Sequence, residues 1–316
     1  MSPLTQVAEA PLLEVRDLRW SYPDGTAALS GMDLGVRRGE NLGLLGPNGC
    51  GKTTLLRLLP RRAKTGLRTW LVPDEPALRP WLSGRENVET LLRLHGVAPL
   101  RARERAAEWL AALGPAHDFV DRPFGVYSRG MRRRTALAAG FAAEPDLLLL
   151  DEPLSGLDPG ARDALATALR DRRDGGATTV FSTHDPEYAA DQCDRTAFLF
   201  GGVCIAADTP DALMATVEDG YRIEIWFDGP PPPTGIAQNF PPGITVGPDG
   251  PDTEAGYPVM TLVVREPPEA LPAVLQTLFA AGASVRSVEV RSPTLADVFR
   301  ALAGHPLARR RTADHR

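Results

Sequence analysis

Residues 46–53 read Gly46-Pro47-Asn48-Gly49-Cys50-Gly51-Lys52-Thr53, which satisfies the pattern G-x-x-x-x-G-K-[ST]. A short apolar strand is predicted before this stretch, over residues 40–45, and a helix after it, over residues 53–59. Glycines let the main chain wrap around a phosphate, and the N-terminus of the helix adds its positive dipole end. We therefore predict a triphosphate-binding loop, in which Lys52 reaches the β- and γ-phosphates and Thr53 offers a hydroxyl to Mg²⁺.

Two acidic residues, which are candidate catalytic residues, follow a run of four leucines. Residues 147–150 are all leucine, and Asp151 and Glu152 come directly after them. An all-apolar run of this length is typical of a parallel strand that is buried on both faces, and such strands present their carboxyl ends to ligands. We expect Asp151 to hold Mg²⁺ through water and Glu152 to polarise the attacking water. An acidic pair that only caps the next turn is the alternative, and the phosphate loop favours the functional interpretation.

The region between and after these motifs alternates between strand and helix patterns. Strands are predicted over residues 12–20, 68–72 and 178–182, and helices over residues 83–94, 100–113, 128–143 and 159–175. Ser83-x-x-Glu86 is a capping box, and Asp158-Pro159 with Gly175 marks the start and the end of another helix. The alternation predicts an α/β layered domain.

The composition changes near residue 218, which suggests a second domain. Strands are predicted over residues 221–227, 261–264 and 285–290, and helices over residues 268–280 and 294–303. We thus predict a flexible N-terminal arm (1–11), a nucleotide-binding domain (12–217), a small α+β accessory domain (218–304) and a disordered basic tail (305–316).

The arginine run at residues 132–134, within the helix predicted over residues 128–143, is expected to be solvated or near nucleotide.

Composition excludes several classes of protein. Of 316 residues, 43% are hydrophobic and 24% charged, with a net charge of −5, so a globular fold is expected and a nucleic-acid partner is not. The three cysteines (Cys50, Cys193 and Cys204) lack C-x-x-C spacing, so neither a disulfide framework nor a zinc site is implied. Because the chain shows neither a secretory signal nor a run of about 18 apolar residues, we expect a cytoplasmic location.

Four further motifs occur in a fixed order along the chain. They are Tyr22 after Trp20-Ser21, Tyr127-Ser128-Arg129-Gly130-Met131, Ser155-Gly156-Leu157-Asp158 and Ser182-Thr183-His184-Asp185. With these motifs, residues 12–217 resemble the ATP-binding subunits of ATP-binding cassette (ABC) transporters, in which they correspond to the adenine-stacking aromatic, the signature motif, the D-loop and the switch histidine. The resemblance implies a P-loop NTPase core of α/β class with an antiparallel β-subdomain and a helical subdomain, followed here by the small α+β domain.

The resemblance also implies how the site works. Two subunits, identical or paralogous, face each other head to tail and enclose ATP and Mg²⁺. Ser128 and Gly130 of one subunit receive the γ-phosphate held by the other, and Asp158 reaches across the interface. His184 contacts the γ-phosphate and holds the water against Glu152. The implied nucleotide-binding set is Tyr22, Gly46, Pro47, Asn48, Gly49, Cys50, Gly51, Lys52, Thr53, Thr54, Ser128, Gly130 and Asp158.

Three departures from the family pattern bear on activity. Arg129 and Met131 replace the usual glycine and glutamine of the signature, a form that resembles exporters of the drug- and antibiotic-resistance type. Asp74 occupies the glutamine position of the Q-loop (residues 72–78), where it could ligate Mg²⁺ or repel the γ-phosphate. Only 21 residues separate Lys52 from Asp74, which predicts a shortened β-subdomain.

These observations predict an ATP-hydrolysing subunit that dimerises on Mg-ATP and drives separate transmembrane permease subunits, for export, from the cytoplasmic face of the membrane. Trp81 and Leu82 are candidates for contact with the permease, with core packing as the alternative. Two other functions stay open: a degenerate cassette that binds ATP as a regulatory module, and an ABC ATPase without a transport role. Glu152 and His184 argue against the first, whereas Asp74 and the shortened segment after the phosphate loop argue for it. The second usually needs a coiled-coil insertion or tandem cassettes, and the sequence shows neither.

Overall fold

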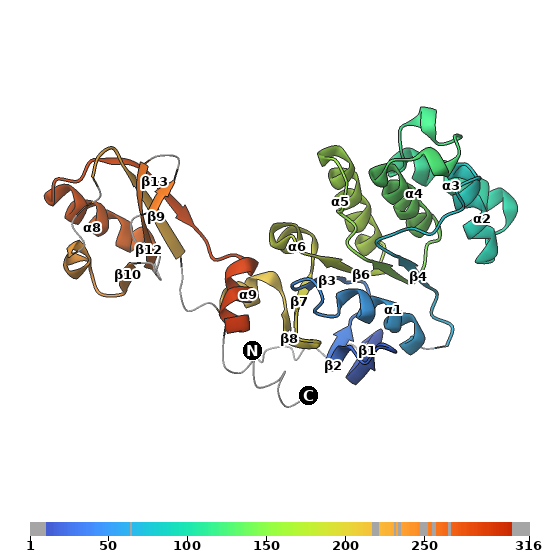
Figure 1. Cartoon of the computed structure of the whole chain (residues 1–316), viewed down its shortest axis with the longest axis horizontal. Helices are drawn as coiled ribbons and strands as arrows, with labels where there is room; N and C mark the ends of the chain where they lie inside the picture. Colours follow the sequence, from blue (N-terminus) through green and yellow to red (C-terminus); the bar gives the residue numbers. More distant parts are fainter. Residues whose placement is uncertain are drawn as a thin grey trace, which may run out of the picture. The chain divides into compact units, whose positions relative to one another are not determined.

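The computed structural model describes residues 11–63, 65–216, 221–230, 232, 235–246, 252–254, 257–264 and 267–304. The chain divides into two compact units, Met1–Pro210 with Leu302–Arg316, and Asp211–Ala301 (Figure 1). The predicted basic tail and, except for Pro11, the predicted N-terminal arm lie outside the described residues, as does the predicted domain boundary at residues 217 and 218.

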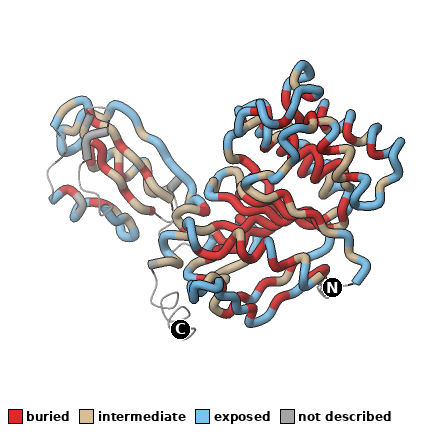
Figure 2. Tube along the Cα trace, turned by 45° about the vertical axis from the view of Figure 1, so that its right-hand side comes forward, coloured by how far each residue is buried: buried red, intermediate tan, exposed pale blue. Residues whose placement is uncertain are grey.

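A six-stranded sheet forms the centre of the first unit, in the order β4-β5-β6-β3-β7-β8. Five strands are parallel and β8 is antiparallel to β7. The strands are β3 (Asn41–Leu45), β4 (Thr69–Val72), β5 (Leu147–Leu150), β6 (Thr178–Thr183), β7 (Arg195–Phe200) and β8 (Val203–Asp208). Every residue of β3, β5 and β6 is buried, as expected for parallel strands covered on both faces (Figure 2).

A separate two-stranded antiparallel sheet pairs β1 (Leu13–Ser21) with β2 (Ala27–Val36). Its buried residues Leu13, Leu29 and Met32 share one core with residues of β3 and of helix α1 (Lys52–Arg62). Among the described residues no strand lies between α1 and β4, in agreement with the expected shortening of the β-subdomain. Figure 1 shows this sheet and α1 on one side of the six-stranded sheet, with α5 and α6 on the other.

Three helices, α2 (Gly84–Leu94), α3 (Pro99–Ala112) and α4 (Arg129–Ala142), pack against one another and form the helical subdomain. The predicted capping box is present, because the Ser83 hydroxyl accepts from the Glu86 amide at 3.1 Å and the Glu86 carboxylate accepts from the Ser83 amide at 2.8 Å. The other elements of this unit are α5 (Pro159–Asp174), α6 (Pro186–Gln192) and the 3₁₀ turns His117–Phe119 and Phe124–Val126, while α7 (Pro210–Met214) begins at its last residue and continues into the second unit.

The start and the end of α5 also follow the sequence. Asp158 caps it by accepting from the Ala161 amide at 2.9 Å, Pro159 is its first residue, and Gly175 lies at its C-terminal cap. None of the helices in the described part of the chain is both long enough and apolar enough to cross a bilayer.

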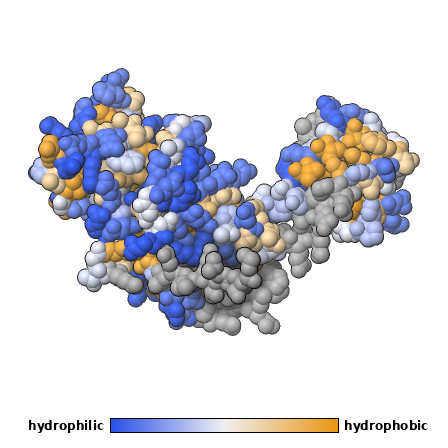
Figure 3. Space-filling view, turned by 180° about the vertical axis from the view of Figure 1, so that it is seen from behind, coloured by the Kyte–Doolittle hydropathy of each residue, from blue (hydrophilic) through white to orange (hydrophobic). Residues whose placement is uncertain are grey.

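The second unit is an α+β module. Its sheet has the order β10-β12-β9-β13, and β11 pairs with β12. The elements are β9 (Tyr221–Phe227), β10 (Ile244–Val246), β11 (Asp252–Glu254), β12 (Tyr257–Val264), β13 (Val285–Arg291), α8 (Pro267–Ala280), α9 (Leu295–Gly304) and the 3₁₀ turn Ile236–Asn239. Alternate residues of β9 (Ile223, Ile225 and Phe227) are fully buried in a core that includes Leu278 of α8. Apolar side chains also gather on the surface of this unit (Figure 3), and Phe279 is among its exposed large hydrophobic residues.

Candidate functional site

The phosphate-loop sequence forms a tight turn between β3 and α1, and two of its glycines are required by the backbone. A Cβ on Gly46 would lie 2.3 Å from the carbonyl oxygen of Leu199 in β7. Gly51, with a φ of +104°, is the N-cap of α1, and a Cβ there would lie 2.6 Å from the carbonyl oxygen of Ala28. Because real Cβ atoms do not approach so closely, these positions accept only glycine without a shift of the backbone.

Lys52 and Thr53 begin α1 and face the acidic pair that follows β5. The buried Lys52 ammonium donates to the carbonyls of Gly46 and Pro47 at 2.7 and 3.2 Å, and its Nζ lies 3.8 Å from Oε1 of Glu152. The Thr53 hydroxyl donates to Oδ1 of Asp151 at 3.1 Å. The two motifs, about 100 residues apart in sequence, therefore meet as the sequence predicts.

Ser182, near the end of β6, joins the two acidic residues. Its hydroxyl donates to Oδ1 of Asp151 at 2.8 Å and accepts from the Glu152 amide at 2.8 Å. Glu152 has a φ of +47°, in the left-handed region, which costs about 1–2 kcal/mol for a residue with a side chain. Backbone strain of this kind often marks a functional position.

His184 follows β6 and contacts the acidic pair. Its Nδ1 lies 2.9 Å from Oε2 of Glu152, so with the proton on Nδ1 the ring donates to that carboxylate. Glu152 thus lies between an ammonium and an imidazole at the carboxyl ends of neighbouring strands. A carboxylate held in this way can accept a proton from water.

The oxygen atoms of Thr53 and Asp151 fit a magnesium ion. Among the described residues no group of three or more His, Cys, Asp or Glu side chains forms a metal cage. Mg²⁺ usually takes only one or two protein oxygens and completes its shell with water and phosphate oxygens. A hydroxyl and a carboxylate that meet beside a phosphate loop are such a donor set.

Tyr22 lies beside the same helix. Its hydroxyl is 2.8 Å from the hydroxyl of Thr54, and the residue is 39% exposed. The structure therefore brings this predicted adenine-stacking residue next to the phosphate loop and leaves part of its surface open to a ligand.

The signature residue Ser128 lies at the start of α4, and Asp158 lies at the start of α5. Ser128 is exposed and caps α4 by accepting from the Met131 amide at 3.2 Å. Asp158 caps α5, and its carboxylate lies 3.5 Å from Nη1 of Arg134. The signature also contacts the D-loop within one chain, because Arg129 donates to the Ser155 hydroxyl at 3.2 Å. The role of Ser128, Gly130 and Asp158 toward a second subunit stays a prediction.

Asp74 contacts α4. Its Oδ1 lies 3.0 Å from Nη2 of Arg133, and its Oδ2 lies 3.9 Å from Nη2 of Arg129. The proposed coordination of Mg²⁺ by Asp74 stays a prediction, and the structure adds this pairing with two arginines.

The sequence motifs did not single out Arg133 as a functional residue. The solvated alternative expected for the arginine run is wrong for this residue, because only 2% of its surface is exposed, whereas a position near nucleotide stays a prediction. A signal was present in the helical period, since Arg133 lies four and eight residues before Leu137 and Phe141, which are both buried.

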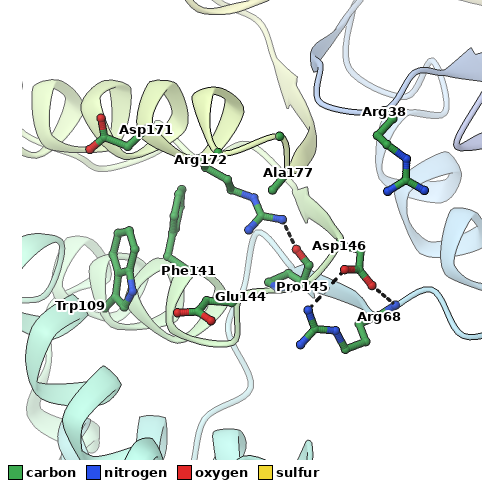
Figure 4. A pocket seen from close by; sticks show the side chains of 12 residues that line it. Arg38, Arg68, Trp109, Phe141, Glu144, Pro145, Asp146, Asp171, Arg172 and Ala177 are labelled. Atoms are coloured by element: carbon green, nitrogen blue, oxygen red, sulfur yellow. Dashed lines mark hydrogen bonds and ion pairs between the residues drawn. The ribbon is translucent and has the colours of Figure 1, made fainter. Parts of the chain in front are cut away.

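A cavity of about 520 Å³ lies at the amino ends of the parallel strands, opposite the carboxyl ends that carry the candidate site (Figure 4). Arg68, Asp146 and Ala177, which line it, immediately precede β4, β5 and β6. Arg68 pairs with Asp146 at 3.3 Å, and the half-buried Arg172 donates to the carbonyl of Pro145. The cavity is therefore at the amino ends of the parallel strands and is not part of the candidate nucleotide site.

Two family models match parts of the chain. Residues 29–66 match the model described as ABC transporter, and residues 117–190 match the model described as AAA domain, putative AbiEii toxin, Type IV TA system. The first covers the phosphate loop, and the second covers the signature motif, the acidic pair and His184.

Curated relatives are similar over nearly the whole chain. The daunorubicin resistance ATP-binding protein DrrA3 of Streptomyces coeruleorubidus is 37% identical over 298 residues, which are 88% of this chain and 91% of that protein. The daunorubicin/doxorubicin resistance ATP-binding protein DrrA of Streptomyces peucetius is 32% identical over 311 residues, 92% of each chain.

Solved structures share the fold. A structure described as the ATP binding subunit of an ABC transporter is 26% identical, with a TM-score of 0.58 over 65% of this chain and 92% of that one. A dimeric post-hydrolysis state of the ATP-binding cassette MJ0796, bound to ADP and Pi, is 24% identical, with a TM-score of 0.57 over 62% of this chain and 98% of that one.

Proposed function

This chain belongs to the ATP-binding proteins of ABC transporters, and from that premise we propose that it binds Mg-ATP between two subunits and drives a separate transmembrane permease. ATP hydrolysis is the activity of this family, and the chain carries the residues for it. The observation that carries the proposal is the meeting of Lys52, Glu152 and His184 at the carboxyl ends of β3, β5 and β6.

The arrangement supports a specific division of roles. Loop amides of residues 49–53 and the ammonium of Lys52 bind the phosphates, and Tyr22 stacks on the adenine. Thr53 and Asp151 hold Mg²⁺, which neutralises charge on the phosphate oxygens. Glu152 takes the proton of the attacking water, while His184 and the strained backbone of Glu152 fix the direction of that carboxylate.

A second subunit completes the site. Ser128 and the amide of Gly130 stand at the exposed N-terminus of α4, which favours binding of an anion. We propose that they contact the γ-phosphate of the facing subunit, identical or paralogous, and that Asp158 lies at the same interface. The dimeric cassette of similar fold supports this arrangement.

The names of two relatives support a proposal about the cargo and the location of the subunit. Those relatives are named for resistance to daunorubicin or doxorubicin, so we propose that this subunit works at the cytoplasmic face of the membrane and powers export of a drug-like compound. Trp81, which is 71% exposed just before α2, is available for contact with such a partner.

The substitution Glu152→Gln tests the proposal. Since it keeps the shape of the side chain and removes the base, we expect turnover to fall by about 10²–10⁴-fold while ATP binding persists. The variant should elute as a dimer at saturating Mg-ATP on a sizing column, and as a monomer with EDTA. A monomer in both conditions would contradict the proposed dimer. Wild-type protein that binds ATP without turnover would favour the regulatory alternative.

A further inference from the structure

Arg133 places a positive charge inside the domain, on the buried face of α4. Arginine is rarely buried to this degree unless it is paired. Burial lowers the pKa of Arg133, and the nearby carboxylates of Asp74 and Asp151 oppose that shift. The residue has no part in the proposed division of roles, so its contacts need another explanation.

The guanidinium of Arg133 joins two segments that are far apart in sequence. Nη1 donates to the carbonyl of Pro73 at 2.6 Å, and Nη2 lies 3.0 Å from Oδ1 of Asp74. Nη2 also donates to the carbonyls of Asp151 and Glu152. One planar group therefore binds the Q-loop, which follows β4, and the acidic pair, which follows β5.

Arg133 and Ser182 together bond both backbone polar groups of Glu152, its carbonyl and its amide. The Glu152 amide donates to the Ser182 hydroxyl at 2.8 Å, and the Glu152 carbonyl accepts from Arg133. The residue between these two bonds has a φ of +47°. A left-handed backbone at a non-glycine residue persists only where its surroundings determine it.

We infer that Arg133 is a positioning residue that holds Glu152 in its left-handed conformation and makes that conformation depend on the Q-loop through Asp74. The inference rests on the proposed role of Glu152 as the base. A shift of the Q-loop removes two of the acceptors of Arg133, so the guanidinium transmits the position of residues 73 and 74 to the carboxylate. In this chain the aspartate at the Q-loop position thereby acts on the site through an arginine.

Two variants of Arg133 and one of Asp74 test the inference. Arg133→Lys keeps the charge but replaces the planar fork by a point charge, which reaches fewer of the four acceptors. Arg133→Met removes the donors, and Asp74→Asn removes the carboxylate charge. Arg132→Lys is the matched control, because among the described residues Arg132 donates to the carbonyls of Tyr127 and Gly125 and to neither of these two segments.

We expect kcat to fall about 10–100-fold in Arg133→Lys, since small misplacements of a reacting group have effects of this size. KM and the Kd for ATP should change less than threefold, because the phosphate loop is untouched. Asp74→Asn should lower kcat in the same way but less, and Arg132→Lys should change it less than twofold. Wild-type kcat in a folded Arg133→Lys protein would overturn the inference.

Combining substitutions separates positioning from general structure. If Arg133 acts through Glu152, Arg133→Met in a Glu152→Gln background should change the residual single-turnover rate less than twofold, and a further tenfold fall would overturn the inference. If Arg133→Met does not fold, Arg133→Lys in the same background replaces it. Full turnover in Glu152→Gln alone would instead reject the proposed base, so the two failures are distinguishable.

Discussion

Gly130, in the first turn of α4, approaches the carbonyl oxygen of Gly156 so closely that a Cβ on Gly130 would lie 2.6 Å from it. Gly156 itself has a φ of +74°, a conformation that favours glycine. The signature motif and the D-loop are thus packed backbone to backbone within one subunit. Gly130 is required for this packing in addition to the phosphate contact proposed for its amide.

The contact predicts the effect of Gly130→Ala. The added methyl group must move one of the two backbones, so we expect a loss of about 1–3 kcal/mol in the free energy of unfolding. Urea denaturation measures this loss, and ATPase activity should fall with it. Gly160→Ala, where the Cβ would have ordinary contact with Asp158 at 3.5 Å, is the control and should not destabilise the protein. Equal stability of both variants would contradict the packing argument.

Lys52→Ala should abolish tight nucleotide binding. The variant loses the one ammonium that lies beside both the phosphate loop and Glu152 in the described structure. We expect Kd for Mg-ATP, measured by titration calorimetry, to rise at least tenfold, which corresponds to about 1.4 kcal/mol. Arg57→Ala, on the exposed side of the same helix, should leave Kd unchanged. Unaltered binding in Lys52→Ala would show that the loop does not hold the phosphates.

Ser182→Ala should weaken both stability and turnover. The substitution leaves the Glu152 amide without its acceptor and removes a donor from Asp151. A buried polar group that loses its partner costs about 1–3 kcal/mol, and the direction of the Glu152 carboxylate becomes less fixed. Thermal unfolding and steady-state ATPase assays measure the two effects. Wild-type kcat would mean that the hydroxyl does not help to orient the carboxylate.

The cysteines should differ in reactivity toward alkylating reagents. Burial raises the pKa of the Cys50 thiol, which Lys52 partly opposes, and burial raises the pKa of Cys193 as well. Because the thiolate is the reactive form, we expect alkylation of half-buried Cys204 first, then Cys50 and Cys193. Mass spectrometry after timed labelling of the native protein gives the order. Faster labelling of Cys50 than of Cys204 would contradict it.

Local patterns explain which parts of the fold the sequence revealed. The phosphate loop, the leucine run before Asp151 and the caps at Ser83 and Asp158 each depend on a few neighbouring residues, so they could be predicted. Strand β2 was missed because Gly31 and Gly35 interrupt its alternation, although pairing with β1 stabilises it in the structure. Propensity alone does not include such long-range pairing.

In the candidate site, too, some features could be predicted from the sequence and others could not. The convergence of Lys52, Glu152 and His184 could be expected, because parallel strands bring their carboxyl ends to one edge. The hydrogen bonds that Ser182 and Arg133 form with the acidic pair could not be predicted, because they depend on the order of the strands in the sheet and on the tertiary position of α4. The helical period around Arg133 indicates that the residue is buried, but it does not indicate which backbone carbonyls the guanidinium contacts.

The register of β6 limits how such a chain can vary in length. Leu45 of β3 pairs with Thr183, and Leu150 of β5 pairs with Phe181, so β6 aligns the ends of its two neighbours. A one-residue insertion within β6 would displace Ser182 by about 3.3 Å and turn it to the opposite face of the sheet. Natural insertions and deletions should therefore fall in the connecting loops, and the spacing from Thr178 to His184 should be constant among chains that retain the activity.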